Sequence, residues 1–239
     1  MSAAHFFVER LDEPRVVLSA TDSRHALRSL RLQPGERLTL SDGAGGLADA
    51  RLQGADGGRA VVKVESVRAV ERPSPSVCVA LAPPKGERLA WAVQKLAELG
   101  CSELMLISTE RSVRTWVGDR GEKIAARLRK VAREAAMQSR QPFVMDLRGP
   151  LPLVEALPPG ETVVVLWEAA TAPLPSVLPP ASDRIRLVVG PEGGFSDDEV
   201  RTAEGRGAAL AGLGRGILRT ETAALVGAAL TLAHYGRLG

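Results

Sequence analysis

The sequence predicts an α/β protein in two parts, a small β-rich part followed by a larger part built on a parallel sheet. Three observations support this prediction. Residues 71–76 read ERPSPS, and two prolines so close together are typical of a linker. Before this linker, short strand-like runs are separated by glycine-containing turns. After it, apolar strand-like runs alternate with helical patterns, which favours parallel strands with helices on both faces of the sheet.

The first part is expected to form a small β-barrel. Its strand-like runs span residues 15–19, 36–41, 46–53 and 59–67. One helix, near 22–32, interrupts these strands, and it carries Arg24, Arg28 and Arg31 beside an apolar stripe. These arginines could contact RNA, or they could simply face water.

The second part is expected to begin with a strand over 77–81 and a helix over 87–99. A strand over 103–108 then precedes a basic helix whose apolar residues recur at helical spacing, at Ile124, Leu128, Val131 and Ala135. The opposite side of this helix fits either a solvated surface or a contact with a nucleic-acid backbone, through Arg127, Lys130 and Arg133. Further strands are expected near Phe143 and over 162–167 and 186–189, followed by two helices.

Composition and motifs argue against several classes of protein. The longest apolar helical pattern, 223–233, is shorter than the roughly 18 residues that a membrane span needs. No signal-like apolar segment is found near the N-terminus. The cysteines lack CxxC spacing and the histidines are scattered, so neither a disulfide framework nor a metal cluster is expected. We therefore expect a cytoplasmic protein with no bound metal and no membrane partner.

Two glycine-rich loops, about twenty residues apart, each follow an apolar run. Residues 187–196 read LVVGPEGGFS, and residues 212–223 read GLGRGILRTETA. The first loop ends in SDDE, a capping box that should begin a helix over 197–204. Because ligands of parallel sheets bind at the carboxyl ends of the strands, both loops should close around one small ligand through backbone groups. Neither loop matches a P-loop or a GxGxxG pattern, so a nucleoside ligand without a polyphosphate fits best.

These loops resemble the signature motifs of the ribosomal RNA small subunit methyltransferase E family, within the knotted SPOUT methyltransferases. Further segments resemble the family in the family order, namely FFV at 6–8, RLQPGE at 31–36, KGER at 85–88, QKLAELG at 94–100 and EAA at 134–136. The resemblance implies a PUA-like RNA-binding β-barrel over 1–72 and a methyltransferase domain over 73–239 whose C-terminal segment forms a trefoil knot. It also implies a homodimer that uses S-adenosylmethionine, without a metal, to methylate N3 of one uridine in the 16S ribosomal RNA of the small ribosomal subunit.

Arg219 and Glu221 are the catalytic candidates. N3 of uridine must lose a proton, so Arg219 could stabilise the resulting anion, and a carboxylate such as Glu221, or water, could accept the proton. Glu221 also lies where a carboxylate would stabilise a helix N-terminus, which is the structural alternative for this residue. The cofactor-binding candidates come from the glycine loops and the strand before them, and they are Leu166, Glu168, Val189, Gly190, Glu192, Gly193, Gly194, Leu213, Gly214, Ile217, Leu218 and Thr222.

Two positions depart from the family pattern. His5 precedes FFV and Gly216 precedes ILR, where members of the family usually have arginines. A histidine is mostly neutral near pH 7, which weakens any role of the N-terminus in holding RNA through a permanent charge. Arg215 and Arg219 are the cations that remain near the second loop. Two alternative functions stay open: a SPOUT enzyme acting on another RNA such as tRNA, and a non-catalytic RNA-binding assembly factor.

Overall fold

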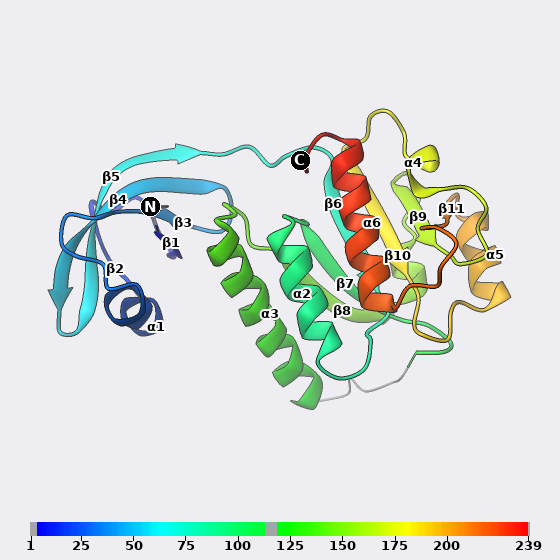
Figure 1. The fold of residues 1–239 in the computed structure, drawn as a ribbon, viewed down its shortest axis with the longest axis horizontal. Coiled ribbons are helices and arrows are strands. Elements are labelled where there is room, and N and C mark those ends of the chain that lie inside the picture. The colour runs from blue at the N-terminus through cyan, green and yellow to red at the C-terminus, as the bar shows by residue number, and fades with distance from the viewer. Residues whose placement is uncertain (1–3, 113–118, 239) are drawn as a thin grey trace. The chain divides into compact units, whose positions relative to one another are not determined.

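The computed structural model describes residues 4–112 and 119–238, and the chain divides into two compact units (Figure 1). The first unit comprises Met1–Arg72 together with Ala136–Val144. The second comprises Pro73–Ala135 and Met145–Gly239. The first unit therefore takes in a short segment from the middle of the chain.

The first unit is built on a five-stranded sheet in the order β1-β3-β4-β5-β2. Its centre is a meander of antiparallel strands, β3 (Arg37–Ser41), β4 (Gly46–Asp56) and β5 (Arg59–Ala69). At one edge β1 (Ala4–Phe7) pairs in parallel with β3, and at the other β2 (Arg15–Val17) pairs antiparallel with β5. The β-rich character of this part was predicted, whereas the strand β1 was not.

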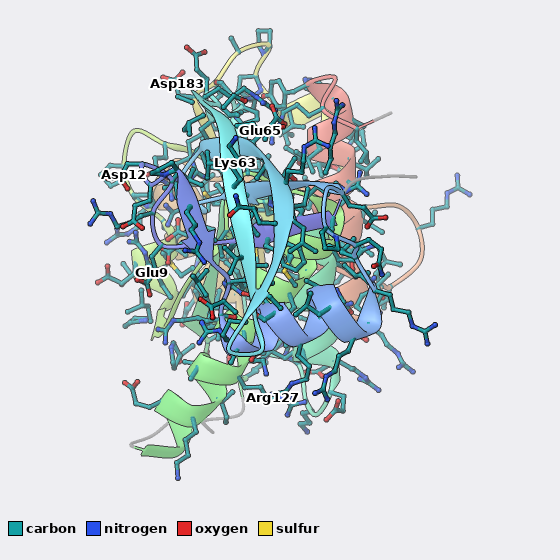
Figure 2. All side chains as sticks on the ribbon, turned by 90° about the vertical axis from the view of Figure 1, so that its left-hand side faces the viewer. Glu9, Asp12, Lys63, Glu65, Arg127 and Asp183 are labelled. Atoms are coloured by element: carbon teal, nitrogen blue, oxygen red, sulfur yellow. The ribbon has the colours of Figure 1, made fainter. Side chains whose placement is uncertain are left out.

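One face of this sheet is buried and the other carries charge, as the alternation of residues along its strands requires. Leu38 and Leu40 of β3 are fully buried in an apolar cluster with Phe6. On β5, Lys63 and Glu65 are exposed, and both side chains project from the sheet in Figure 2. The Glu65 carboxylate accepts a hydrogen bond of 2.8 Å from Arg51 on β4.

The helix of the first unit is shorter than the expected 22–32. Helix α1 (Ala20–Arg24) begins where the Ser19 hydroxyl accepts a hydrogen bond from the Asp22 N–H at 3.0 Å, and a π-helical turn, His25–Ser29, follows it. Arg31 then adopts a left-handed φ of 54°, which ends the helical path. The expected extension of the helix to residue 32 is therefore wrong.

The segment 136–144 is hydrogen-bonded into the first unit. The Val144 N–H donates to the Gly43 carbonyl at 2.9 Å, and the Ser41 hydroxyl donates to the Pro142 carbonyl at 2.9 Å. Phe143 forms only an isolated bridge with Ala44, and the strand that follows is β8 (Asp146–Pro152). The expected strand near Phe143 is therefore wrong by a few residues.

The second unit contains a six-stranded sheet in which every strand pair is parallel, as the alternation of strands and helices predicted. The order is β11-β9-β10-β6-β7-β8. Besides β8, its strands are β6 (Ser76–Leu81), β7 (Glu103–Ser108), β9 (Thr162–Leu166), β10 (Arg184–Val189) and β11 (Ala209–Ala211). The three-residue strand β11 was not expected.

Apolar clusters cover both faces of this sheet. Along β6, Val77, Val79 and Leu81 belong to one cluster, whereas Ala80 belongs to the other. The first cluster is completed by helices α2 (Arg88–Glu98), α3 (Asp119–Ser139), α4 (Leu174–Val177) and α6 (Thr220–His234). The second is completed by α5 (Asp197–Gly205) and a 3₁₀ turn, Leu153–Ala156.

The path of the C-terminal segment positions the site. Strand β11 lies at the edge of the sheet, but α6, which follows it, packs over β6 and β10 near the middle, beside α2 (Figure 1). A Cβ on Gly227 of α6 would lie 2.6 Å from Leu166 Cδ1, so the helix needs glycine there to approach β9 closely. The second glycine loop, which joins β11 to α6, thereby meets the ends of β9 and β10.

Candidate functional site

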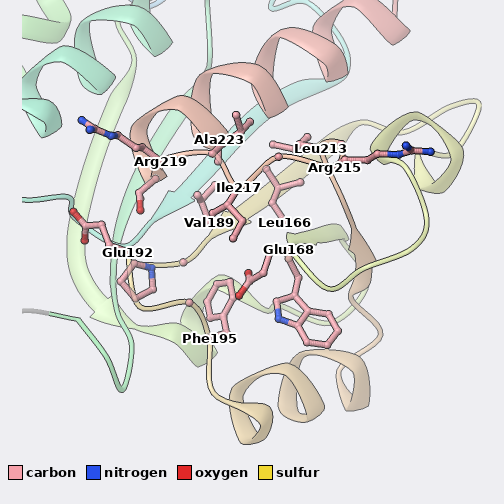
Figure 3. A pocket seen from close by; sticks show the side chains of 18 residues that line it. Leu166, Glu168, Val189, Glu192, Phe195, Leu213, Arg215, Ile217, Arg219 and Ala223 are labelled. Carbon is pink, nitrogen blue, oxygen red and sulfur yellow. The ribbon is translucent and has the colours of Figure 1, made fainter.

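A hollow of about 270 Å³ opens at the carboxyl ends of β9 and β10. Leu166 and Val189, the last residues of these strands, form part of its wall, and the two glycine loops form its sides. Figure 3 shows Leu166, Val189 and Ile217 together at its centre, with Glu168 between Leu166 and Phe195. The site therefore lies where ligands of open parallel sheets bind.

The first glycine loop packs closely against two side chains of its surroundings. A Cβ on Gly190 would lie 3.0 Å from the Phe195 ring, and a Cβ on Gly194 would lie 2.9 Å from Glu168 Oε1. Gly194 also has a left-handed φ of 69°, which few residues other than glycine adopt without strain. The loop ends in the predicted capping box, where the Ser196 N–H donates to Glu199 Oε2 at 2.9 Å.

The second glycine loop is held by the loop after β9. The Gly212 N–H donates to the Ala172 carbonyl at 2.8 Å, and the Gly212 carbonyl accepts from the Leu174 N–H at 3.1 Å. Gly214 has a φ of 127°, which again favours glycine. Beyond it the chain is open to solvent, and Ile217 is 86% exposed at the rim of the hollow. The loop thus presents backbone and apolar side chains to a ligand.

The structure brings together most of the cofactor-binding candidates. All of them line the hollow except Gly193 and Thr222. Several residues that the sequence reasoning missed also line it: Trp167, Pro191, Phe195, Arg215, Gly216, Thr220 and Ala223. The sequence did contain a signal for two of these residues, because both are aromatic. Trp167 directly follows the end of β9, and Phe195 directly follows the glycine pair at 193–194.

The two catalytic candidates lie in different environments. Arg219 is exposed, precedes the first residue of α6 and lines the hollow. In Figure 3 its side chain and that of Arg215 extend from the loop in opposite directions. Glu221 is only 8% exposed and does not line the hollow. Its Oε1 lies 3.7 Å from Arg88 Nε, and its Oε2 has no hydrogen-bond partner among the described residues.

Metal ligands and reactive thiols are not assembled in the part of the chain that the structure describes. Residues 4–112 and 119–238 contain no group of three or more His, Cys, Asp or Glu side chains that could hold a metal ion. Burial raises the pKa of the Cys101 thiol to about 12 and also raises that of Cys78, so both stay protonated at neutral pH. Among the described helices, none combines the length and apolarity needed to cross a bilayer.

In the first unit, a basic hollow of about 520 Å³ lies between the helical segment and the β4–β5 turn. Arg24 and Arg28 line it, as does Arg59, which the sequence reasoning missed. The Arg59 Nε donates to the Leu18 carbonyl at 2.8 Å, which holds the guanidinium group in place. Arg31 is exposed but does not line the hollow.

The basic helix of the second unit has the expected sidedness. In α3, Leu128 is buried in the core, while Arg127 and Lys130 are exposed and form long ion pairs, with Glu87 at 3.5 Å and Glu134 at 3.7 Å. Arg133 is half-buried. Exposed pairs of this length are weak, so both cations remain available to a phosphate.

The two departures from the family pattern have structural consequences. His5 is 5% exposed, and its Nδ1 lies 2.8 Å from the Thr39 hydroxyl oxygen. Burial lowers the pKa of His5 from 6.5 to about 4, so its ring is neutral at pH 7. Gly216 has no atom within 4 Å of the place where a Cβ would stand, so the backbone there leaves room for a side chain.

Comparison with known proteins identifies the class to which this fold and site belong. A family described as RNA methyltransferase domain matches residues 71–232. A second, described as RNA methyltransferase PUA domain, matches residues 18–65. The chain is therefore an RNA methyltransferase with a PUA domain.

Individual relatives define the family further. Ribosomal RNA small subunit methyltransferase E of Mycobacterium bovis is 34% identical, over 95% of this chain and 90% of that protein. The protein of the same name from Bacillus subtilis is 30% identical, over 90% and 88%. A crystal structure of a ribosomal RNA small subunit methyltransferase E from Neisseria gonorrhoeae, bound to S-adenosyl methionine, matches with a TM-score of 0.86 and 27% identity, over 97% of this chain and 98% of that one. This chain belongs to the ribosomal RNA small subunit methyltransferase E family.

Proposed function

We propose that this protein transfers the methyl group of S-adenosylmethionine to N3 of one uridine in the 16S ribosomal RNA of the small ribosomal subunit. Family membership gives the coarser activity, methylation of ribosomal RNA with S-adenosylmethionine as the donor. The observation that carries the proposal for this chain is the hollow between two glycine loops at the carboxyl ends of β9 and β10.

The residues around the hollow fit the donor. Gly190 packs against the Phe195 ring with little room for a Cβ, and Gly194 has a left-handed φ that favours glycine, so both glycines keep the loop in the conformation that borders the hollow. Leu166 and Val189 offer apolar surface to a nucleoside, and Glu168 supplies a carboxylate that can accept hydrogen bonds from hydroxyl or ammonium groups. When bound, S-adenosylmethionine supplies an electrophilic methyl group on a positively charged sulfur.

The transfer itself needs a deprotonated N3 aligned with the methyl group. A bond forms between N3 and the methyl carbon, the bond between sulfur and that carbon breaks, and its electron pair stays on sulfur. Arg219, a cation on the rim, stabilises the negative charge of the deprotonated uracil ring. The N3 proton goes to water or to Glu221, and Glu221 is the weaker candidate because it is buried beside Arg88 and does not line the hollow. Because the transfer needs N3 and the methyl group to be aligned, positioning of the two substrates supplies most of the rate enhancement.

The RNA is held by cations outside the donor hollow. We propose that residues 1–72 form a PUA-like RNA-binding β-barrel in which Arg24 and Arg28 contact phosphates from the basic hollow. Arg31, which is exposed, supplies a further cation outside this hollow. On α3, Arg127, Lys130 and Arg133 supply further phosphate contacts.

The remaining family expectations belong to the same proposal. Residues 73–239 form a SPOUT domain whose C-terminal segment threads a trefoil knot, as the family resemblance implies. The enzyme works as a homodimer in the cytoplasm, as the family resemblance implies. Light scattering should give twice the 25.3 kDa chain mass, and a monomer at micromolar concentration would refute the dimer.

Mass spectrometry of ribosomal RNA tests the proposed reaction. A strain that lacks this protein should lose one methylated uridine from 16S ribosomal RNA, and the purified protein with S-adenosylmethionine should restore it. Loss of a methyl group from tRNA instead would show a different RNA substrate. Unchanged methylation of every RNA, with a defect in subunit assembly, would show a non-catalytic assembly factor.

A further inference from the structure

Arg111, which follows β7, lies against the first glycine loop. Its Nη1 donates hydrogen bonds to the carbonyl oxygens of Gly193 at 2.9 Å and of Phe195 at 3.3 Å. Its aliphatic stem covers Gly193, because a Cβ placed on that glycine would lie 3.4 Å from Arg111 Cβ. One side chain from a different strand end therefore holds two alternate carbonyls of the loop.

The residue before Arg111 is tied to the same loop. Glu199 Oε1 accepts a hydrogen bond from the Glu110 N–H at 2.8 Å, while its Oε2 accepts one from the Ser196 N–H at 2.9 Å. Inside the loop, the Gly194 N–H donates to the Pro191 carbonyl at 2.9 Å. Successive polar groups of the loop thus have partners within the protein before any ligand arrives.

We propose that Arg111 is a positioning residue for the donor site, which holds the first glycine loop in the conformation that receives S-adenosylmethionine. This inference rests on the proposed function. Without the guanidinium, the Gly193 and Phe195 carbonyls lose their shared partner and the loop gains other conformations. The donor must then order the loop as it binds, and this cost lowers its affinity.

The positive charge of Arg111 and its hydrogen bonds would have opposite effects on the affinity for the donor. S-adenosylmethionine carries a net positive charge, from a sulfonium and an ammonium against one carboxylate, whereas S-adenosylhomocysteine has no net charge. A nearby cation would repel the donor and leave the product almost unaffected. A positioning residue instead helps both ligands by the same factor, because both need the same loop conformation.

The experiment compares Arg111→Ala with Arg111→Lys, and with Arg201→Ala as a matched control. Arg201 is an exposed arginine of α5 whose ion pair is with Asp198 and which does not line the hollow. Calorimetry on the full chain should show that Arg111→Ala weakens both ligands about tenfold, the factor that about 1.4 kcal/mol of lost hydrogen bonding corresponds to. Arg201→Ala should change neither affinity.

Steady-state kinetics distinguishes a positioning role of Arg111 from a direct role in methyl transfer. The KM for S-adenosylmethionine should rise about tenfold in Arg111→Ala while kcat at saturating donor changes by less than about threefold, and Arg111→Lys should recover part of the loss. A lower kcat with unchanged KM, unchanged affinities in Arg111→Ala, or tighter donor binding with unchanged product binding would each overturn the proposal. If Arg111→Ala does not fold, the test falls to Arg111→Lys. A donor affinity equal to that of the wild type, at both high and low salt, would then overturn the proposal. A wild-type protein that binds no donor would refute the proposed function itself.

Discussion

Gly194 offers the sharpest test of the donor site. Its φ of 69° costs a residue with a side chain roughly 1–2 kcal/mol, and a Cβ there would lie 2.9 Å from Glu168 Oε1. The strain in Gly194→Ala should shift the free loop away from the conformation in which Arg111 holds it. The donor must then restore that conformation as it binds, so the strain should appear as weaker donor binding. The expected loss of affinity for S-adenosylmethionine is roughly 5- to 30-fold.

The neighbouring Gly193→Ala is the matched control. Its φ is outside the left-handed region, and its Cβ would make only an ordinary contact of 3.4 Å with the Arg111 stem. Calorimetry and thermal melting on both variants and the wild type are the assay. Gly193→Ala should bind the donor within about twofold of wild type, well inside the range of surface substitutions. If Gly194→Ala matched Gly193→Ala in affinity and in melting temperature, the loop would not be the donor site.

Three further predictions follow from other parts of the molecule. Arg219→Ala should slow single-turnover methylation by roughly 100-fold at saturating RNA and donor, the scale of one preorganised electrostatic contact; an unchanged rate with weaker RNA binding would make it a binding residue. Replacing Arg24, Arg28 and Arg59 together by Ala should weaken RNA binding and reduce its salt dependence by up to about three units of slope, without changing donor affinity; an unchanged slope would place the RNA elsewhere. Because burial lowers the pKa of His5 from 6.5 to about 4, the unfolded chain binds a proton more readily in this window. Stability should therefore fall as the pH drops from 6.5 towards 4, by up to about 1.4 kcal/mol per pH unit, and melting curves of His5→Gln should lack this part of the decline.

The parallel sheet of the second unit was predictable because its central strands are buried on both faces and read as apolar runs. β7 was expected over 103–108, and its observed bounds are the same. The edge strands gave weaker signals: β11 has three residues, and β8 contains a glycine and two prolines, which are typical of edges rather than of sheet interiors. In the first unit, β1 is four residues long and its partner lies more than thirty residues away, so local pattern alone could not reveal it.

The hollow at the ends of β9 and β10 was predictable to the extent that backbone forms it. Glycine and capping residues mark the loops in the sequence, and most of the candidates drawn from them line the hollow. Arg111 and Arg59 carried no such mark, because each makes its contact with a residue distant in the chain: Gly193 in one case and Leu18 in the other. Such roles depend on the fold and become visible only with it.

The segment 136–144 decides how this protein can be divided for study. A fragment that stops at residue 72 would lack the carbonyl that receives the Ser41 hydroxyl and the ring that lies 4.3 Å beneath the Arg72 guanidinium. It would also uncover Gly45, against which the Phe143 ring packs so closely that a Cβ would lie 2.7 Å from it. An isolated first unit should therefore carry 136–144 on a short artificial connection, and a chimera that exchanges this unit between relatives should exchange that segment as well.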